Sequence, residues 1–234
     1  VGRIVAKLKA KGELENTLIL FCSDNGACPF ERTRRPDLKP WDPKSYWTYD
    51  ASWALAGNTP FRLYKQNQHE GGISSPLIAH WPAGLKAKAG SITHQPAHLI
   101  DFMATFLKVS GAKYPKRVGD RNIDPLMGKS MLPILQGKQR SGHDTLYFHF
   151  GTDRALRQGK WKLVSAKLGR WELYDMESDR TEMNDLSALY PKKLKAMAAK
   201  WFDLAKNTEQ LKGRHLNPVK SGLSKMNFRK DIFK

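Results

Sequence analysis

Two adjacent oxygen-bearing side chains, those of Asp24 and Asn25, directly follow an apolar run in this chain. The run, Thr17-Leu-Ile-Leu-Phe21, is typical of a strand that is buried on both faces. The turn composition Ser23-Asp-Asn-Gly26 ends it, at the edge where open α/β sheets place their sites. A carboxylate beside an amide carbonyl suits a hard cation such as Ca²⁺ or Mg²⁺. An ordinary strand-ending turn has the same composition, so both interpretations stay open at this point.

A second group of chemically active residue types lies in the segment Asn58-Thr-Pro-Phe-Arg-Leu-Tyr-Lys65-Gln-Asn-Gln-His69-Glu70-Gly-Gly72. Two adjacent glycines predict a tight turn in which the backbone is exposed to close approach. We therefore expect Glu70 to anchor this turn rather than to act as a base. Lys65 offers a positive charge, although a surface lysine would look the same in isolation.

The elements that would position these residues alternate between helix and strand, which predicts an α/β fold. A helix precedes the first strand and ends at Gly12. A short buried strand, Leu77-Ile-Ala79, follows the second motif and ends at Trp81-Pro82. The spacing of apolar residues then predicts an amphipathic helix from Gln95 to Gly111. Its inward residues would be Leu99, Phe102, Met103, Phe106, Leu107 and Val109.

The remaining segments differ in composition. Residues 27–57 are rich in Pro, Trp and Tyr, and we expect them to be irregular but ordered, as a wall of a pocket. Segments 146–150, 160–164 and 170–174 are short and aromatic, which predicts a small antiparallel sheet. A helix that opens at Tyr190-Pro191 would pack on this sheet and form an α+β subdomain. The apolar side of that helix would carry Leu194, Met197, Ala198, Trp201, Phe202 and Leu204.

Composition limits the classes of partner. Forty Lys and Arg against 22 Asp and Glu give a net charge of +18, which favours anionic partners. No nucleic-acid motif accompanies this charge, so a basic face that steers an anionic substrate and a merely solvated surface both remain open. No apolar run is long enough to span a membrane. The two cysteines, Cys22 and Cys28, form no disulfide framework.

Several segments, in order, resemble the sulfatases of the alkaline-phosphatase superfamily. The metal-ligand motif of that family resembles Leu18–Gly26, and its lysine-plus-EGG motif resembles Asn58–Ile73. Further similarity extends through segments 76–82, 98–107, 128–137, 154–164 and 172–179. The resemblance implies the C-terminal part of an alkaline-phosphatase-like catalytic α/β domain over residues 1–115, an α+β subdomain over 116–212 and a basic tail over 213–234.

The resemblance also implies roles for individual residues. Asp24 and Asn25 match ligands to a divalent cation, usually Ca²⁺ with Mg²⁺ as the alternative. Lys65 matches the lysine that contacts the sulfate group and the leaving-group oxygen. His69 would line the substrate pocket, or it would hydrogen-bond a backbone carbonyl. The implied activity is sulfuric ester hydrolysis of the arylsulfatase type, acting on a small-molecule or polysaccharide sulfate ester. Family habit implies export to the periplasm or the outside.

The departures from the family pattern are equally informative. The nucleophile of the family is a formylglycine made within a Cys/Ser-x-Pro-x-Arg motif, and Cys28-Pro-Phe-Glu-Arg32 does not fit that motif. Phe150 stands where one subgroup has a histidine, and His149 is one position off. We expect the chain to be a C-terminal fragment, inactive alone, whose nucleophile lies upstream of Val1. The alternatives are a phosphodiesterase or phosphonate-type hydrolase of the same superfamily, and a non-catalytic module that binds sulfated polysaccharide.

Overall fold

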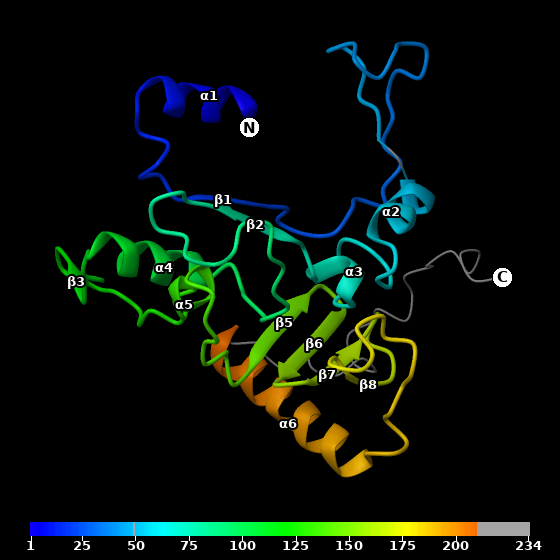
Figure 1. Cartoon of the computed structure of the whole chain (residues 1–234). Helices are drawn as coiled ribbons and strands as arrows, with labels where there is room; N and C mark the ends of the chain where they lie inside the picture. The colour runs from blue at the N-terminus through cyan, green and yellow to red at the C-terminus, as the bar shows by residue number, and fades with distance from the viewer. Residues whose placement is uncertain (49, 210–234) are drawn as a thin grey trace. The chain divides into compact units, whose positions relative to one another are not determined.

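The computed structural model describes residues 1–48 and 50–209, and its elements are labelled in Figure 1. Backbone contacts divide the chain into two compact units. Unit 1 contains residues 1–23 and 76–144, and unit 2 contains residues 24–75 and those from 145 onward. The domain division after residues 115 and 212 stays a prediction, and the basic tail over 213–234 lies outside the described residues.

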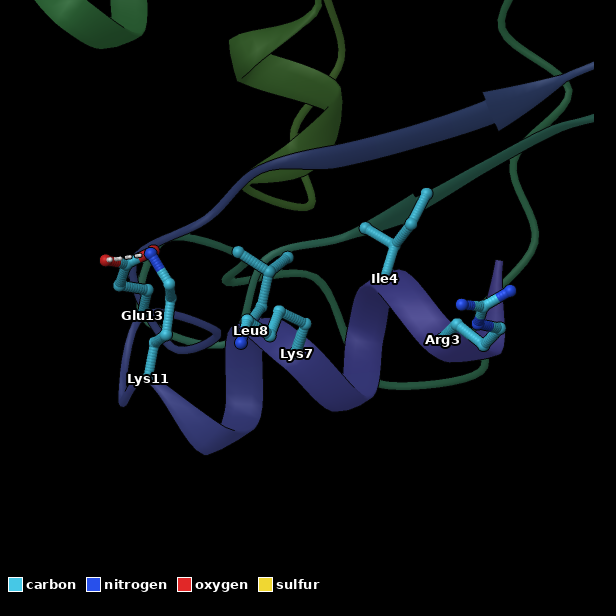
Figure 2. A pocket seen from close by; sticks show the side chains of 6 residues that line it. All are labelled: Arg3, Ile4, Lys7, Leu8, Lys11 and Glu13. Atoms are coloured by element: carbon cyan, nitrogen blue, oxygen red, sulfur yellow. Dashed lines mark ion pairs between the residues drawn. The ribbon is translucent and has the colours of Figure 1, made fainter.

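Unit 1 begins with the expected helix, α1 (Gly2–Ala10), which ends before Gly12 at φ 71°. Helix α1 buries none of its side chains. A hollow beside this helix is shown in Figure 2, and it contains no candidate catalytic residue. The hollow is lined by Arg3, Ile4, Lys7, Leu8, Lys11 and Glu13.

The first strand, β1 (Ile19–Cys22), forms where the apolar run predicts it, and it pairs antiparallel with β2 (Leu77–His80). Burial on both faces was the wrong expectation for these strands. Phe21 is 52% exposed and Ile78 is 62% exposed. Within the described residues β2 is the only strand bonded to β1. The β-branched and aromatic composition therefore predicts that a strand forms here, but it does not predict how far each face of the strand is buried.

The second helix of unit 1, α4 (Asp101–Ser110), ends at Gly111 as expected, with φ 74°. It begins six residues later than predicted, because the Asp101 carboxylate accepts the His98 amide at 2.9 Å and closes a turn before the helix. The predicted inward face is also wrong. The buried residues are Asp101, Ala104 and Thr105, whereas Leu99, Met103 and Phe106 are about half exposed.

Polar bonds explain the orientation of α4. Asp101 is fully buried and accepts Arg140 Nη2 at 2.8 Å, and its Oδ1 lies 2.6 Å from His143 Nε2. The Thr105 hydroxyl accepts the amide of Met131 at 2.9 Å. A buried charge needs its partners more than a large apolar side chain needs burial, so Asp101 decides which face turns inward. Unit 1 is completed by β3 (Arg117–Val118), β4 (Arg121–Asn122) and the short α5 (Leu132–Leu135).

Unit 2 contains the small antiparallel sheet that the aromatic segments predict. Its strands follow the order β5 (Leu146–Phe150), β6 (Asp153–Gln158), β7 (Trp161–Ser165) and β8 (Glu172–Asp175). Strand β6 was not predicted, because its two arginines and its aspartate hide the apolar pattern. Helix α6 (Pro191–Thr208) packs on the sheet as expected (Figure 1). The core between them contains Leu156, Leu163, Leu173, Met197, Trp201 and Ala205.

Residues 27–57 are less irregular than expected, because α2 (Asp50–Asn58) occupies their end. Trp41 is 81% exposed and Trp53 is 69% exposed. Neither ring is buried among the described residues, and the pocket wall that the aromatic density predicts stays a prediction. None of the helices in the described part of the chain is both long and apolar enough to cross a membrane.

Trp201 tests the core of unit 2. Its side chain is fully buried, stacks on Tyr147 at 5.4 Å, and donates its indole N–H to the carbonyl of Phe148 at 3.1 Å. We expect Trp201→Ala to lower the free energy of unfolding by about 3–5 kcal/mol, measured by urea denaturation. Met183→Ala, at an exposed side chain, should change it by less than about 0.5 kcal/mol. Similar losses for both variants would contradict this core.

Candidate functional site

Backbone hydrogen bonds join the two sequence motifs within unit 2. Gly26 donates its N–H to the carbonyl of Gly72 at 2.9 Å, and Lys65 donates its N–H to the carbonyl of Ala27 at 3.1 Å. The first bond fixes the residue that follows Asn25, and the second fixes the backbone of the candidate catalytic lysine. The structure therefore brings the predicted metal-ligand turn and the predicted lysine motif side by side.

The side chain of Asn58 strengthens this junction. Its Oδ1 accepts the N–H of Ala27 at 3.3 Å, and its Nδ2 donates to the carbonyl of Leu63 at 3.0 Å. One amide side chain thus bonds both motifs at once. An aspartate could accept the first bond but could not donate the second.

Glycines make this close approach possible. A Cβ atom on Gly26 would collide with the carbonyl group of Gly71. A Cβ on Gly71 would collide with the carbonyls of Arg62 and Leu63. Gly71 and Gly72 lie in α3 (Glu70–Ile73), a single helical turn where the sequence predicts a tight turn. The backbones of the two motifs therefore pack directly on each other, with no side chain between them.

The candidate metal ligands are accessible. Asp24 is exposed, and Asn25 is partly buried in a bend directly after β1. Their donor set, one carboxylate and one amide oxygen, fits a hard cation. Ca²⁺ takes six to eight oxygen ligands, so this pair fits as part of a coordination shell. Among residues 1–48 and 50–209, no three His, Cys, Asp or Glu side chains gather in a way that would hold a metal ion by themselves.

His69 is 1% exposed, and its Nε2 lies 3.2 Å from Glu172 Oε2 in β8. The ring is therefore engaged by a carboxylate rather than by the backbone carbonyl considered above. The hydrogen bond from His69 lowers the pKa of Glu172 to about 2, with Tyr174 and Arg62 acting in the same direction. A role for His69 in binding substrate stays a prediction.

Glu70 anchors α3 through a buried ion triad, which we define as Glu70, Lys162 and Glu182. Lys162 Nζ lies 2.7 Å from Glu70 Oε1 and 2.8 Å from Glu182 Oε1. Glu182 Oε2 accepts the backbone N–H of Glu70 at 2.8 Å. Burial would raise the pKa of Glu70, but the charge and hydrogen bond of Lys162 outweigh it and hold that pKa below its ordinary value.

Arg62 makes a second connection from the same segment to the C-terminal sheet. Its Nη1 donates to the Tyr174 hydroxyl at 2.8 Å and to the carbonyl of Glu182 at 3.0 Å, and lies 3.3 Å from Glu172 Oε2. The Tyr174 hydroxyl in turn donates to the same Glu172 oxygen at 2.7 Å. Glu172 is thus surrounded by three donors, which explains why it stays ionised although it is largely buried.

Sequence reasoning missed Lys162, Glu172 and Glu182 as parts of this site. The sequence around Lys162 contains an indication of its role. Lys162 lies in a strand between Trp161 and the apolar residues Leu163 and Val164, and a lysine inside such a strand must have a counter-ion. Nothing in the local sequence indicates which carboxylates supply it, because Glu70 lies 92 residues away.

Backbone strain gathers around the same contacts. Leu63 at φ 61°, Gln66 at φ 77° and Glu182 at φ 56° all have left-handed backbones that favour glycine. Such positions cost on the order of 1–3 kcal/mol each and persist only where surrounding contacts hold them. Two of them lie in the lysine motif and the third belongs to the ion triad.

The other candidate side chains lie elsewhere. His149 Nδ1 is 2.8 Å from Glu209 Oε2, and its ring meets that of Trp201 edge-on at 5.3 Å. These contacts place His149 against α6, in a structural role. Phe150, at the position of the missing histidine, is 54% exposed. Cys22 and Cys28 are both free thiols.

Comparison with known proteins shows the family of the chain. Residues 1–112 match the family described as sulfatase, and residues 61–210, more than half of the chain, match the one described as N-sulphoglucosamine sulphohydrolase, C-terminal. Steryl-sulfatase of Mus musculus is 34% identical over 168 residues, 71% of this chain and 23% of that protein. N-acetylgalactosamine-6-sulfatase of Mus musculus is 30% identical over 162 residues, 69% of this chain and 26% of that protein.

A solved structure, Ps i-CgsB in complex with k-i-k-neocarrahexaose, aligns with a TM-score of 0.64 and 25% identity, covering 86% of this chain and 39% of that one. The fold and the joined motifs define an alkaline-phosphatase-like α/β protein. The chain belongs to the sulfatase family. It spans about a quarter of the length of the two mouse relatives.

The contact between the motifs can be tested with one methyl group. Gly26→Ala should lower the free energy of unfolding by about 1–3 kcal/mol, because the added Cβ meets the Gly71 carbonyl and forces the backbones apart. Gly57→Ala in α2 is the matched control, since its Cβ would have no neighbour within 4 Å, and it should be neutral or stabilising. Equal urea midpoints for the wild type and Gly26→Ala would show that the motifs do not pack this way.

Glu172 should make stability depend on pH in the acid range. Its pKa is about 2 in the folded chain and 4.5 as a free group, so its contribution is complete above pH 4.5 and is lost as pH falls toward 2. The difference corresponds to roughly 3 kcal/mol. In urea unfolding at stepped pH, Glu172→Gln should flatten the profile between pH 4.5 and 2. An NMR titration that finds the Glu172 carboxyl midpoint near 4.5 would rule out the network.

Proposed function

We propose that this chain is the C-terminal part of a sulfuric ester hydrolase of the arylsulfatase type. The observation that carries the proposal is the backbone junction between Gly26–Ala27 and the segment that contains Lys65 and Gly72. It brings an acidic turn and a lysine together at the carboxyl end of β1. The matches to sulfatases over both halves of the chain support the same conclusion.

Asp24 and Asn25 would hold a divalent cation, Ca²⁺ or Mg²⁺, as two ligands of a larger set. When bound, such an ion supplies Lewis-acid stabilisation of negative charge on sulfate oxygens. The role of the chain would be to hold the turn that contains Asp24 and Asn25. The hydrogen bond between Gly26 and Gly72 and the side chain of Asn58 hold this turn in place.

Lys65 would bind the sulfate group and the ester oxygen that leaves with the alcohol. As the sulfur–oxygen bond breaks, negative charge grows on that oxygen, and an ammonium held by a fixed backbone stabilises it without reorganisation. In this proposal the hydrogen bond from the Lys65 amide to the carbonyl of Ala27 contributes to function, because it fixes the backbone from which the lysine side chain extends. His69 would act at the pocket from a buried position beside Glu172.

The substrate in this proposal is a sulfate ester of a sugar, a polysaccharide or a small alcohol. The relatives and neighbours include a steryl-sulfatase, an N-acetylgalactosamine-6-sulfatase and a protein solved with k-i-k-neocarrahexaose. The chain's charge of +18 suits such anionic substrates. The nucleophile, a formylglycine, would be supplied by a segment outside this sequence, and the whole enzyme would be exported.

Lys65→Ala tests the proposed role. In the enzyme that contains this chain, the substitution should lower kcat for an aryl sulfate about 100- to 1,000-fold, because it removes one fixed stabiliser of the developing charge. Lys44→Ala, at an exposed lysine, should leave kcat unchanged. Steady-state kinetics on the sulfate and phosphate esters of one aryl alcohol provide the measurement.

The same assay separates the alternatives. Preference for the phosphate ester would favour a phosphodiesterase or phosphonate-type hydrolase. A non-catalytic module would give no turnover of either ester, and its binding to a sulfated glycan would be unaffected by Lys65→Ala. Full activity of Lys65→Ala on the sulfate ester would remove this residue from the mechanism.

A further inference from the structure

Residues 62–72, which carry Lys65, are held in place without any buried apolar side chain. The buried members of this segment are Gln68, His69, Glu70 and two glycines. Hydrophobic burial therefore contributes little to fixing its position. The segment also includes two left-handed residues, Leu63 and Gln66, which resist the observed conformation.

Charged contacts at both ends of the segment take the place of an apolar anchor. At one end Arg62 meets Glu172, with the Tyr174 hydroxyl bonded to both. At the other end Glu70 meets Lys162, which is 1% exposed. All of these partners belong to β7 and β8, and Glu182 follows them in the chain.

The two faces of the C-terminal sheet differ in this respect. Side chains alternate along a strand, so Leu163 and Lys162 lie on opposite faces of β7. Leu163 packs in the core against α6, together with Trp201. Lys162 lies on the other face, where its ammonium is directed to Glu70 of the lysine motif. The face of Lys162 also carries a small buried apolar cluster that includes Val164 and Tyr174, and it provides the charges that hold the motif.

We propose that Lys162 is a positioning residue for Lys65, acting through the buried ion triad with Glu70 and Glu182. It touches no reacting atom. It fixes α3, and through the Gly72–Gly26 and Lys65–Ala27 backbone bonds it fixes the lysine against the metal-ligand turn. This inference rests on the proposed function for its catalytic consequence, but not for its structural one.

The structural test is amide hydrogen exchange on the full chain. The probes are the amides of Gly26 and Lys65, which bond across the junction, and those of Gly71 and Gly72, which bond to the carbonyls of Arg62 and His69 within the lysine motif. Lys162→Met leaves two buried carboxylates facing each other, so these amides should exchange at least about tenfold faster while those of β5 and β6 keep their rates. Lys160→Met is the matched control, because Lys160 lies two residues before Lys162 and forms a partly exposed ion pair with Asp175, and it should leave the probes unchanged.

A milder variant covers the case in which Lys162→Met does not fold. Glu70→Gln keeps the 2.8 Å pair between Lys162 and Glu182 and should accelerate the same amides by a smaller factor. Unchanged exchange at the four probes, or an equal acceleration throughout the sheet, would overturn the positioning role in either variant.

The catalytic consequence is measured in the enzyme that contains this chain. A displaced Lys65 loses transition-state contacts, so Glu70→Gln and Lys162→Met should lower kcat for an aryl sulfate at least about tenfold with KM changed less than about threefold. A purely structural role would lower the amount of folded enzyme and leave kcat per folded molecule intact, which would contradict the proposal. If the wild-type enzyme hydrolyses no sulfate ester, the proposed function fails, and the exchange result still decides whether Lys162 positions the motif.

Discussion

The buried ammonium group of Lys162 is the constraint on which the candidate site depends. A lysine that is 1% exposed cannot keep its charge without close carboxylates, and Glu70 and Glu182 lie within 2.8 Å of it. Both must therefore be in place before β7 can bury this residue. Because Glu70 opens α3, satisfying Lys162 also places the glycines that contact the metal-ligand turn. The need of Lys162 for counter-ions in the C-terminal sheet thus fixes the position of Glu70 and α3 at the candidate site.

Stability and specificity are divided between two kinds of contact in unit 2. The α6 side of the sheet is apolar and aromatic, and a second buried cluster, formed by Ala155, Val164, Tyr174 and Met176, adds hydrophobic free energy on the opposite side. The opposite side adds ion pairs, among them those of Glu172 and Lys162, and the desolvation cost of each buried charge offsets part of its attraction. What they provide is a specific arrangement, because Arg62 meets Glu172 at one end of the lysine motif and Glu70 meets Lys162 at the other.

Local patterns predict much of the fold, while long-range polar contacts account for what they miss. The 3.6-residue period over residues 191–208 indicates α6 and its inward residues, and the Asp24–Gly26 composition indicates a turn after a strand. The face of α4 was mispredicted because Asp101 decides it through Arg140, which lies 39 residues away and leaves no periodic signal. The partners of Lys162 leave no local signal for the same reason, because Glu70 lies 92 residues away. Roles for the site residues came from resemblance to a family, since a turn and a lysine are common by themselves.

The spacing of the ion triad along the chain has a consequence for biosynthesis. During synthesis, Glu70 is made 92 residues before its partner Lys162. At 5–20 residues per second this interval lasts on the order of ten seconds. During that time the lysine motif has emerged with its glycines and strained residues but without the charges that hold it. The contacts of Glu70 with Lys162 and Glu182 can therefore form only after β7 and Glu182 have left the ribosome.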